Sequence, residues 1–357
     1  MRSEQAHFAT RSSVQALLSY AENAPDKARF LMGETMAGGT SALNQRDKMV
    51  ASIAKMIDDY IAKADVQHPT PDLPLIALIG GVMRLIAVRL RNSERHFQKL
   101  AIELSDWLDT YNQPIAERRW RSLEHGPPLP PSPHTADLRL APPRSIQRGR
   151  VRLTPEEVEH NHRERIIFAT AKAVSEKGYN ATTVADIARA AGIDRRVFYM
   201  YFEDKEKAFM AVHELSAQQV MAVASSAFFD GRTWPDRLWK GIRAATHFDE
   251  TYPTFCHTGY VEAHAVGGPA IQRINDTRMA FTMFLQEGYQ HTTHPPSPSA
   301  LEAITTCIFE IAYNQTRKGN ATQLGRATAL GTYLALSPFL GAQAANQFID
   351  NKLREVS

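Results

Sequence analysis

Hydrophobic residues recur at helical spacing along almost the whole chain, while the alternation typical of half-exposed strands is nearly absent. Residues 47–62 predict an amphipathic helix, whose inner face holds Met49, Ile53, Met56, Ile57 and Ile61. Residues 73–90 are apolar nearly all round, which is typical of a helix buried between other helices. The pattern therefore predicts an all-α protein.

A run of prolines divides the chain. Seven of the 18 residues from Gly126 to Pro143 are proline, which fixes φ and has no N–H to donate to a helix. We therefore expect a semi-rigid, extended linker over residues 126–150. It separates a first helical half, residues 1–125, from a second half, residues 151–357.

The two halves resemble each other weakly. Five positions match at a spacing of 228 residues: Glu34, Ala37, Gly39, Ala42 and Leu43 against Glu262, Ala265, Gly267, Ala270 and Ile271. Further on the spacing is 226, with Met83, Arg91, Trp107 and Leu108 against Phe309, Arg317, Tyr333 and Leu334. The nearly constant spacing predicts an internal duplication of one helical domain, although amphipathic helices also resemble one another by chance.

One segment, residues 163–209, has no counterpart in the first half. Its pattern predicts a helix that Gly178 ends, followed by two short helices at 184–191 and 195–201. The expected caps and turn residues of the short helices are Thr182 or Thr183, Gly192 and Asp194. Two helices joined by a tight turn with glycine form the arrangement that places the second helix in the major groove of DNA.

The last of these helices carries the candidate chemistry. Val197, Phe198 and Phe202 are expected to anchor it, which leaves arginines and tyrosines to project outward. Guanidinium groups bind phosphates or guanine edges, and tyrosine hydroxyls donate to phosphate oxygens. Four arginines precede the segment and fit either an arm along DNA or a solubilising linker end: Arg144, Arg148, Arg150 and Arg152.

The segment resembles the DNA-binding domain of the TetR family of bacterial transcriptional regulators. The resemblance rests on three runs: Thr182-Thr183-Val184-Ala185-Asp186-Ile187-Ala188, Ala191-Gly192-Ile193, and Phe198-Tyr199-x-Tyr201-Phe202-x-Asp204-Lys205-Glu206. It implies a DNA-binding domain at 151–209 and a helical ligand-binding and dimerisation domain at 210–357. The first half resembles that second domain without its DNA-binding head, and a start codon assigned too late would look the same.

The resemblance also implies roles for individual residues. Thr183, Tyr199, Tyr201 and Lys205 would contact phosphates, and Arg195 or Arg196 would approach base edges. The family usually has serine or threonine where Asp194 stands and often glycine where Arg196 stands, so operator preference does not carry over. A ligand pocket in the second bundle is expected to use Phe248, Tyr252, Phe255, Tyr260, Met283 and Phe309.

The resemblance also assigns a dimer interface. It would use residues 299–318 and 321–336, and their counterparts in the first half are residues 73–91 and 95–111. If the two copies pair within one chain, the protein is a pseudo-dimer with a single head. If the second copies of two chains pair, it is a homodimer, and we expect the homodimer because a lone head makes few contacts.

Composition and charge narrow the possibilities. The 41 Lys and Arg exceed the 38 Asp and Glu by a net charge of only +3, so a basic DNA-binding surface must be local. There are two cysteines and no run of about 18 apolar residues, which fits a reducing cytosol and no membrane span. The family resemblance implies the bacterial cytoplasm, at the nucleoid. Neither a histidine spacing typical of zinc sites nor a catalytic constellation is found, so no metal, cofactor or enzyme activity is expected.

These observations predict a ligand-responsive transcriptional regulator, more specifically a repressor that reads an operator with the helix at 195–201. Its expected partners are double-stranded DNA and a small-molecule effector. The alternative is a ligand-binding or protein-interaction module whose DNA-binding head is vestigial. The acidic Asp194 and the small net charge keep this alternative open.

Overall fold

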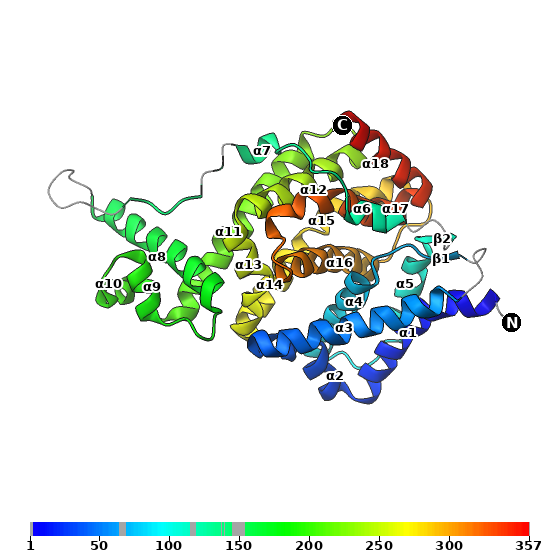
Figure 1. Cartoon of the computed structure of the whole chain (residues 1–357), viewed down its shortest axis with the longest axis horizontal. Helices are drawn as coiled ribbons and strands as arrows, with labels where there is room; N and C mark the ends of the chain where they lie inside the picture. The colour runs from blue at the N-terminus through cyan, green and yellow to red at the C-terminus, as the bar shows by residue number, and fades with distance from the viewer. Residues whose placement is uncertain are drawn as a thin grey trace.

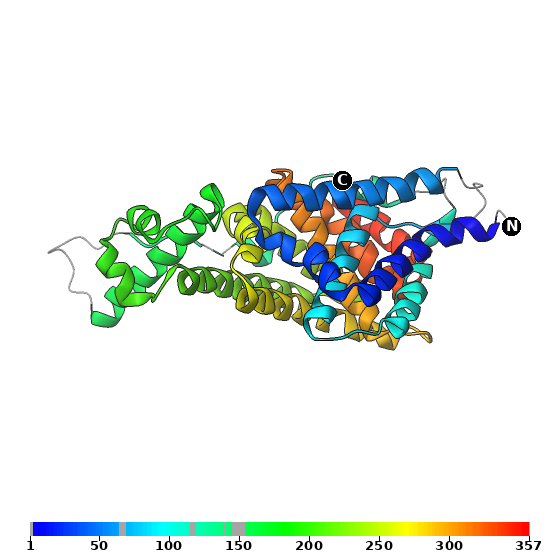
Figure 2. The same cartoon turned by 90° about the horizontal axis from the view of Figure 1, so that it is seen from below.

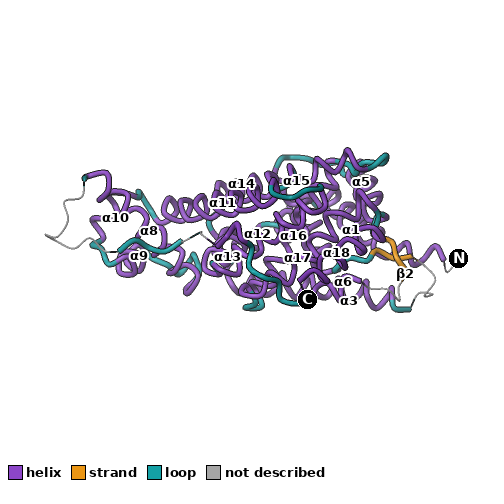
Figure 3. The backbone as a smooth tube through the Cα atoms, turned by 90° about the horizontal axis from the view of Figure 1, so that it is seen from above, coloured by secondary structure: helices purple, strands orange, loops and turns teal. Residues whose placement is uncertain are grey.

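The computed structural model describes residues 3–63, 69–114, 119–136, 138, 140–144 and 154–356. Within these residues all regular secondary structure is helical apart from β1 (Pro69–Pro71) and β2 (Asn112–Pro114), which pair antiparallel. A small head lies at one end of an elongated body, and the N-terminus lies at the opposite end (Figures 1 and 2). The two strands also lie far from the head (Figure 3). The all-α fold expected from the sequence is confirmed.

The first half contributes one side of the body. Its elements are α1 (Ser3–Asn23), α2 (Pro25–Met32), η1 (Glu34–Ala37), α3 (Gly39–Ile61), α4 (Leu75–Arg91), α5 (Gln98–Asp109) and α6 (Arg119–Glu124). The expected buried helix over 73–90 is α4, which begins after Pro74 because proline has no N–H to donate and suits a helix start.

The second half contributes the head and the other side of the body. The head consists of α8 (Pro155–Lys177), α9 (Val184–Ala191) and α10 (Arg195–Tyr201), and α11 (Lys205–Phe229) runs from the head into the body (Figure 1). The remaining elements are α12 (Trp234–Thr251), α13 (Pro253–Tyr260), η3 (Glu262–Ala265), α14 (Gly268–Ala280), α15 (Met283–Gln286), η4 (Glu287–His291), α16 (Pro298–Arg317), η5 (Ala321–Ala327), α17 (Thr328–Leu340) and α18 (Ala342–Val356).

The two halves share one hydrophobic core. Its buried residues come from α1 to α6 and from α11, α12 and α15 to α18. At the centre α4 packs against α16, and two glycines let the helices approach closely. A Cβ on Gly80 would overlap Glu310, and a Cβ on Gly81 would lie 2.8 Å from Cys307 Sγ. The first half is therefore an integral part of the body.

The proline-rich segment lies against α12. Arg243 donates from Nε to the carbonyl oxygen of Pro130 (2.9 Å) and from Nη2 to that of Leu129 (3.0 Å). The N–H of Ser132 donates to His247 Nδ1 (3.0 Å), just before the single helical turn α7 (Pro133–Ala136). This part of the expected linker therefore packs on the second half, because its carbonyl groups accept hydrogen bonds from Arg243 of α12.

The end of the linker is only partly described. Arg144 is exposed, and its carbonyl oxygen accepts from Asn161 Nδ2 (3.0 Å). The other three arginines of the expected arm lie outside the described residues: Arg148, Arg150 and Arg152. In the described part of the chain, no helix is both long enough and apolar enough to cross a membrane.

Candidate nucleic-acid interface and ligand cavity

Side-chain caps define the two short helices of the head. Thr183 Oγ1 accepts from the N–H of Asp186 (3.2 Å), whose carboxylate accepts from the N–H of Thr183 (3.1 Å). Each group satisfies a donor that the start of α9 leaves free. Gly192 ends α9 with φ 63°, a conformation that glycine adopts without a steric penalty. Asp194 then caps α10 by accepting from the N–H of Arg196 (2.8 Å). The expected caps and turn are all present.

One face of α10 is anchored and the other is free. Phe198 and Phe202 are buried in the head core. The exposed face carries four side chains: Arg195, Arg196, Tyr199 and Met200. Neither guanidinium group has an ion-pair partner among the residues that the structure describes. Positive charge, a hydroxyl and an apolar side chain are therefore presented together, as the chemistry of DNA recognition requires.

Met200 is a candidate contact that sequence analysis missed. It is 73% exposed, more than Tyr199 at 52%. Its place four residues after Arg196 puts it on the same helical face, which was the available signal. Apolar side chains in the major groove contact the methyl group of thymine.

The other predicted DNA contacts are already engaged within the head. The hydroxyl of Tyr201 lies 3.3 Å from His162 Nδ1, and the ring is half-buried. Lys205 Nζ donates to the carbonyl oxygens of Tyr179 (2.7 Å) and Thr182 (2.9 Å) and lies over the Tyr179 ring. Burial lowers the pKa of Lys205. Because an ammonium group has three donors, one remains for a phosphate.

Thr183 is similarly occupied. Its hydroxyl donates to Asp186 Oδ2 (2.7 Å) while it caps α9, although the side chain stays exposed. Hydrogen bonds from Lys177 and Thr183 hold the pKa of Asp186 well below its usual range. A negative charge therefore sits at the start of α9.

A largely apolar cavity of about 130 Å³ lies in the second half, between α11, α12, α13, α14, α16 and α17. Three of the six predicted pocket residues line it: Phe255, Tyr260 and Phe309. The other three lie elsewhere. Phe248 packs against Val223, Ala227 and Ala244, the Tyr252 hydroxyl donates to the carbonyl oxygen of Leu138, and Met283 is 51% exposed. The reason lies in the tertiary structure, since these side chains leave their helices in different directions.

Two polar residues inside the cavity were not predicted. Asp249 accepts from the Tyr260 hydroxyl (3.0 Å), and burial raises the pKa of Asp249 to about 7. His213 is buried, and its Nε2 has no hydrogen-bond partner among the described residues. Burial lowers its pKa, so the ring is neutral. A cavity of this kind suits a mostly apolar ligand with few polar groups.

The thiol of Cys256 lies in the cavity wall, 3.2 Å from Thr316 Oγ1, and burial raises its pKa well above the usual range. A thiol in such surroundings is unreactive. In the described part of the chain, no group of three or more His, Cys, Asp or Glu side chains could hold a metal ion.

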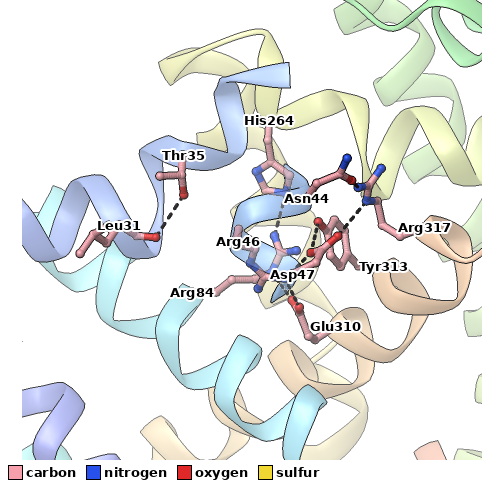
Figure 4. Close-up of polar contacts among 10 residues, drawn as sticks. All are labelled: Leu31, Thr35, Asn44, Arg46, Asp47, Arg84, His264, Glu310, Tyr313 and Arg317. Carbon is pink, nitrogen blue, oxygen red and sulfur yellow. Dashed lines mark hydrogen bonds and ion pairs between the residues drawn. The ribbon is translucent and has the colours of Figure 1, made fainter. Parts of the chain in front are cut away.

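A buried polar cluster joins the two halves (Figure 4). Glu310 of α16 accepts from Arg46 Nη1 of α3 (2.5 Å) and from Arg84 Nε of α4 (2.6 Å). Burial alone would raise the pKa of Glu310, but the two guanidinium groups hold it below its usual value. Arg84 Nη1 also lies 2.7 Å from His264 Nε2. Because arginine only donates, this nitrogen accepts and His264 is neutral.

The head is similar in sequence to known proteins. Residues 166–212 match the family model of bacterial regulatory proteins, tetR family. Over 69 residues the chain is 32% identical to the HTH-type transcriptional regulator AcrR of Shigella flexneri. That stretch is 19% of this chain and 32% of the relative, so the match spans about a third of the relative's length.

Solved structures of similar proteins match about half of the chain. The fatty acid degradation regulator FadR from Bacillus halodurans is 17% identical, with 52% of this chain and 97% of that chain covered and a TM-score of 0.46. FadR from Bacillus subtilis, solved in complex with stearoyl-CoA, is 18% identical, with 49% and 97% covered and a TM-score of 0.44. Over residues 166–212, the head of this chain is therefore similar to the TetR family of bacterial regulatory proteins.

Proposed function

We propose that this protein is a ligand-responsive transcriptional repressor that reads an operator with α10. The exposed face of α10 carries the proposal, because it presents Arg195, Arg196, Tyr199 and Met200 together. Neither guanidinium group has an ion-pair partner in the described part of the chain. A helix of this kind reads base edges in the major groove while neighbouring groups fix its position on phosphates.

Helix α11 is the proposed connection between ligand and DNA. Its first turns pack against α8 in the head. Six of its residues line the cavity: His213, Ser216, Ala217, Val220, Ala224 and Phe228. A ligand that favours one placement of α11 would shift the position of the head. The size of the response is limited by the difference in ligand affinity between the two placements.

The first half is proposed to be a headless copy of the second. The helices α2 and α13 both have eight residues, both begin with proline, and start 228 residues apart. The short helices η1 and η3 keep the same spacing. Gly39 and Gly267, also 228 apart, both have positive φ, at 74° and 115°. Matching element lengths and turns support a duplication more strongly than matching apolar residues do.

We further propose that the chain is a pseudo-dimer with one head. The face of α16 that the family resemblance assigns to dimerisation is covered by α4. Residues 226 apart meet there, namely Arg84 with Glu310 and Gly81 with Cys307. Equivalent residues meet in this way on the axis of a two-fold dimer. The expectation of a homodimer gives way to this proposal, in which one chain binds one operator half-site.

The decisive test is DNA binding by the full chain. The probe is the intergenic DNA beside the protein's own gene, measured by fluorescence anisotropy at two salt concentrations. Replacing Arg196 by alanine removes a charged contact, so Arg196→Ala should weaken binding by about 1–3 kcal/mol, and affinity should fall as salt rises. Arg354→Ala is the matched control, since Arg354 lies on α18 of the body.

Equal binding by Arg196→Ala and the unchanged chain would reject α10 as the reading helix. Absence of DNA binding by the folded chain would favour the second candidate, a ligand-binding or interaction module with a vestigial head. Asp194 is the observation behind that candidate, because its carboxylate stands at the start of α10.

A further inference from the structure

The junction between the halves has two sides with unequal contents. The Arg84–Glu310 contact lies at the centre, and α3 covers one side (Figure 4). On that side Asp47 of α3 accepts from the Tyr313 hydroxyl (2.8 Å) and from Arg317 Nε (3.0 Å). A carboxylate and an aromatic ring thus fill this side, and the carboxylate neutralises Arg317.

The other side lacks both groups. The positions equivalent to Asp47, Tyr313 and Arg317, at the same spacings of 228 and 226, hold Asn275, Ala87 and Arg91. An amide therefore stands in place of a carboxylate, and a methyl group in place of a ring, while the arginine is kept. Asn275, Ala87 and Arg91 all line a second cavity of about 40 Å³.

Two buried donors at this cavity have no acceptor among the residues that the structure describes. Arg278 is 3% exposed and Asn275 is 7% exposed, and they lie three residues apart on one face of α14. Within the described residues, neither Arg278 Nε nor Asn275 Nδ2 has a hydrogen-bond partner. A buried donor left unpaired costs about 1–3 kcal/mol, and more when it is charged.

The carboxylates nearby are already committed to other arginines. Glu310 pairs with Arg46 and Arg84, and Glu302 pairs with Arg89. Burial lowers the pKa of Arg278 to about 10, which still leaves the side chain charged at neutral pH. The second cavity therefore holds positive charge that the described part of the chain does not neutralise.

The two cavities adjoin. They share four lining residues: Gly259, Tyr260, Ile274 and Phe309. The larger is mostly apolar, and the smaller is lined by three arginines: Arg84, Arg91 and Arg278. About 10–15 Å³ of such space holds one water molecule, so the smaller cavity has room for about three atoms of that size, as in a carboxylate.

We propose that the cavity between α4 and α14 binds the carboxylate of an amphipathic ligand whose apolar body occupies the larger cavity. The ligand carboxylate would take the place that Asp47 holds on the opposite side of the junction. Arginine suits this role because its fork of N–H donors matches the two oxygens of a carboxylate. This inference names the effector class for the proposed regulator, and it assigns the first half a share in the site through Arg84 and Arg91.

The test compares two ligands that differ only in charge. Calorimetry on the full chain measures binding of dodecanoate and of dodecan-1-ol, without DNA. We expect dodecanoate to bind at least tenfold more tightly. Arg278→Met should remove that preference and leave the affinity for dodecan-1-ol unchanged. Arg273→Met is the matched control, because Arg273 is exposed on the same helix, and it should retain the preference.

A second variant tests the same site if Arg278→Met fails to fold. Asn275→Leu removes the other unpaired donor and should lower the affinity for dodecanoate but not for dodecan-1-ol. Equal binding of the two ligands, binding of neither, or an equal loss of both in Arg278→Met would overturn the inference. Because DNA is absent, a carboxylate preference would stand even if the operator proposal failed, and DNA binding without that preference would reject only the carboxylate site.

Discussion

At the scale of single residues, the buried charges are the most informative feature. Glu310 is buried together with Arg46 and Arg84, and both of its oxygens accept hydrogen bonds. Replacing one partner of such a group strongly destabilises a protein, because a charge is then left uncompensated. Asp249 and Arg278 are buried without an opposite charge in contact among the described residues, and both lie at cavities. The positions that are costly for folding therefore coincide with the proposed ligand sites.

Asp249 should make stability depend on pH. An unfolded aspartate titrates near ~3.9, whereas burial raises the pKa of Asp249 to about 7. Between these values the folded state binds more protons than the unfolded state, so stability falls as pH rises through this window. Asp249→Asn removes the charge. Relative to the unchanged protein, the variant's free energy of unfolding in urea should therefore rise by about 3 kcal/mol between pH 5 and pH 8.

The control for this measurement is Asp276→Asn, a charge removal at an exposed position of α14. Its difference from the unchanged protein should stay nearly constant with pH. A constant difference for Asp249→Asn as well would show that Asp249 is ionised in the folded protein throughout this range.

At the scale of elements, the start of α10 combines stability and recognition. Asp194 satisfies a free N–H of the helix, and its negative charge is favourable at that end. The same charge would be repelled by a DNA phosphate close to Arg195 and Arg196. The Asp194 carboxylate thus stabilises α10 but would weaken the proposed binding to DNA.

Two substitutions at Asp194 separate these demands. Asp194→Asn keeps a capping oxygen and removes the charge, so DNA affinity at low salt should rise several-fold. Asp194→Ala removes the cap as well and should cost the head about 1 kcal/mol. Anisotropy and thermal unfolding measure the two effects. An unchanged affinity in Asp194→Asn would mean that no phosphate approaches the start of α10.

At the scale of the whole molecule, the first half takes the place of a second subunit in the proposed pseudo-dimer. It buries α4 against α16, contributes to the shared core and supplies two arginines to the small cavity. With a single head the chain would contact only one half-site, which lowers affinity compared with a two-headed dimer. In return, the two sides of the junction differ, and we propose that the side with the small cavity binds the ligand.

The pseudo-dimer proposal predicts the mass in solution. Light scattering should find the full chain as a monomer, which binds one DNA half-site. A shortened chain of residues 126–357 exposes the α16 face that α4 covers and should form dimers through it, because an uncovered apolar face favours association. A full chain that is a dimer at low concentration would contradict the proposal.

The sequence by itself determined the helical class, the position of the head, and its caps and turn. These features depend on residues close together in the chain, such as Thr183 with Asp186 or Gly192 after α9, and so the local pattern predicts them. The resemblance to the TetR family was carried by the same local motifs, and it is confirmed over residues 166–212.

Only the tertiary structure decided which side chains share a cavity. Phe255 and Tyr260 line it while Phe248 and Met283 do not, although all are apolar residues at helical spacing. Two further features depend on contacts between residues far apart in the chain. They are the burial of Arg278 without an ion-pair partner among the described residues and the packing of the proline-rich segment on α12. Periodicity shows which face of a helix is buried, but the neighbours that it meets are set by how the helices pack.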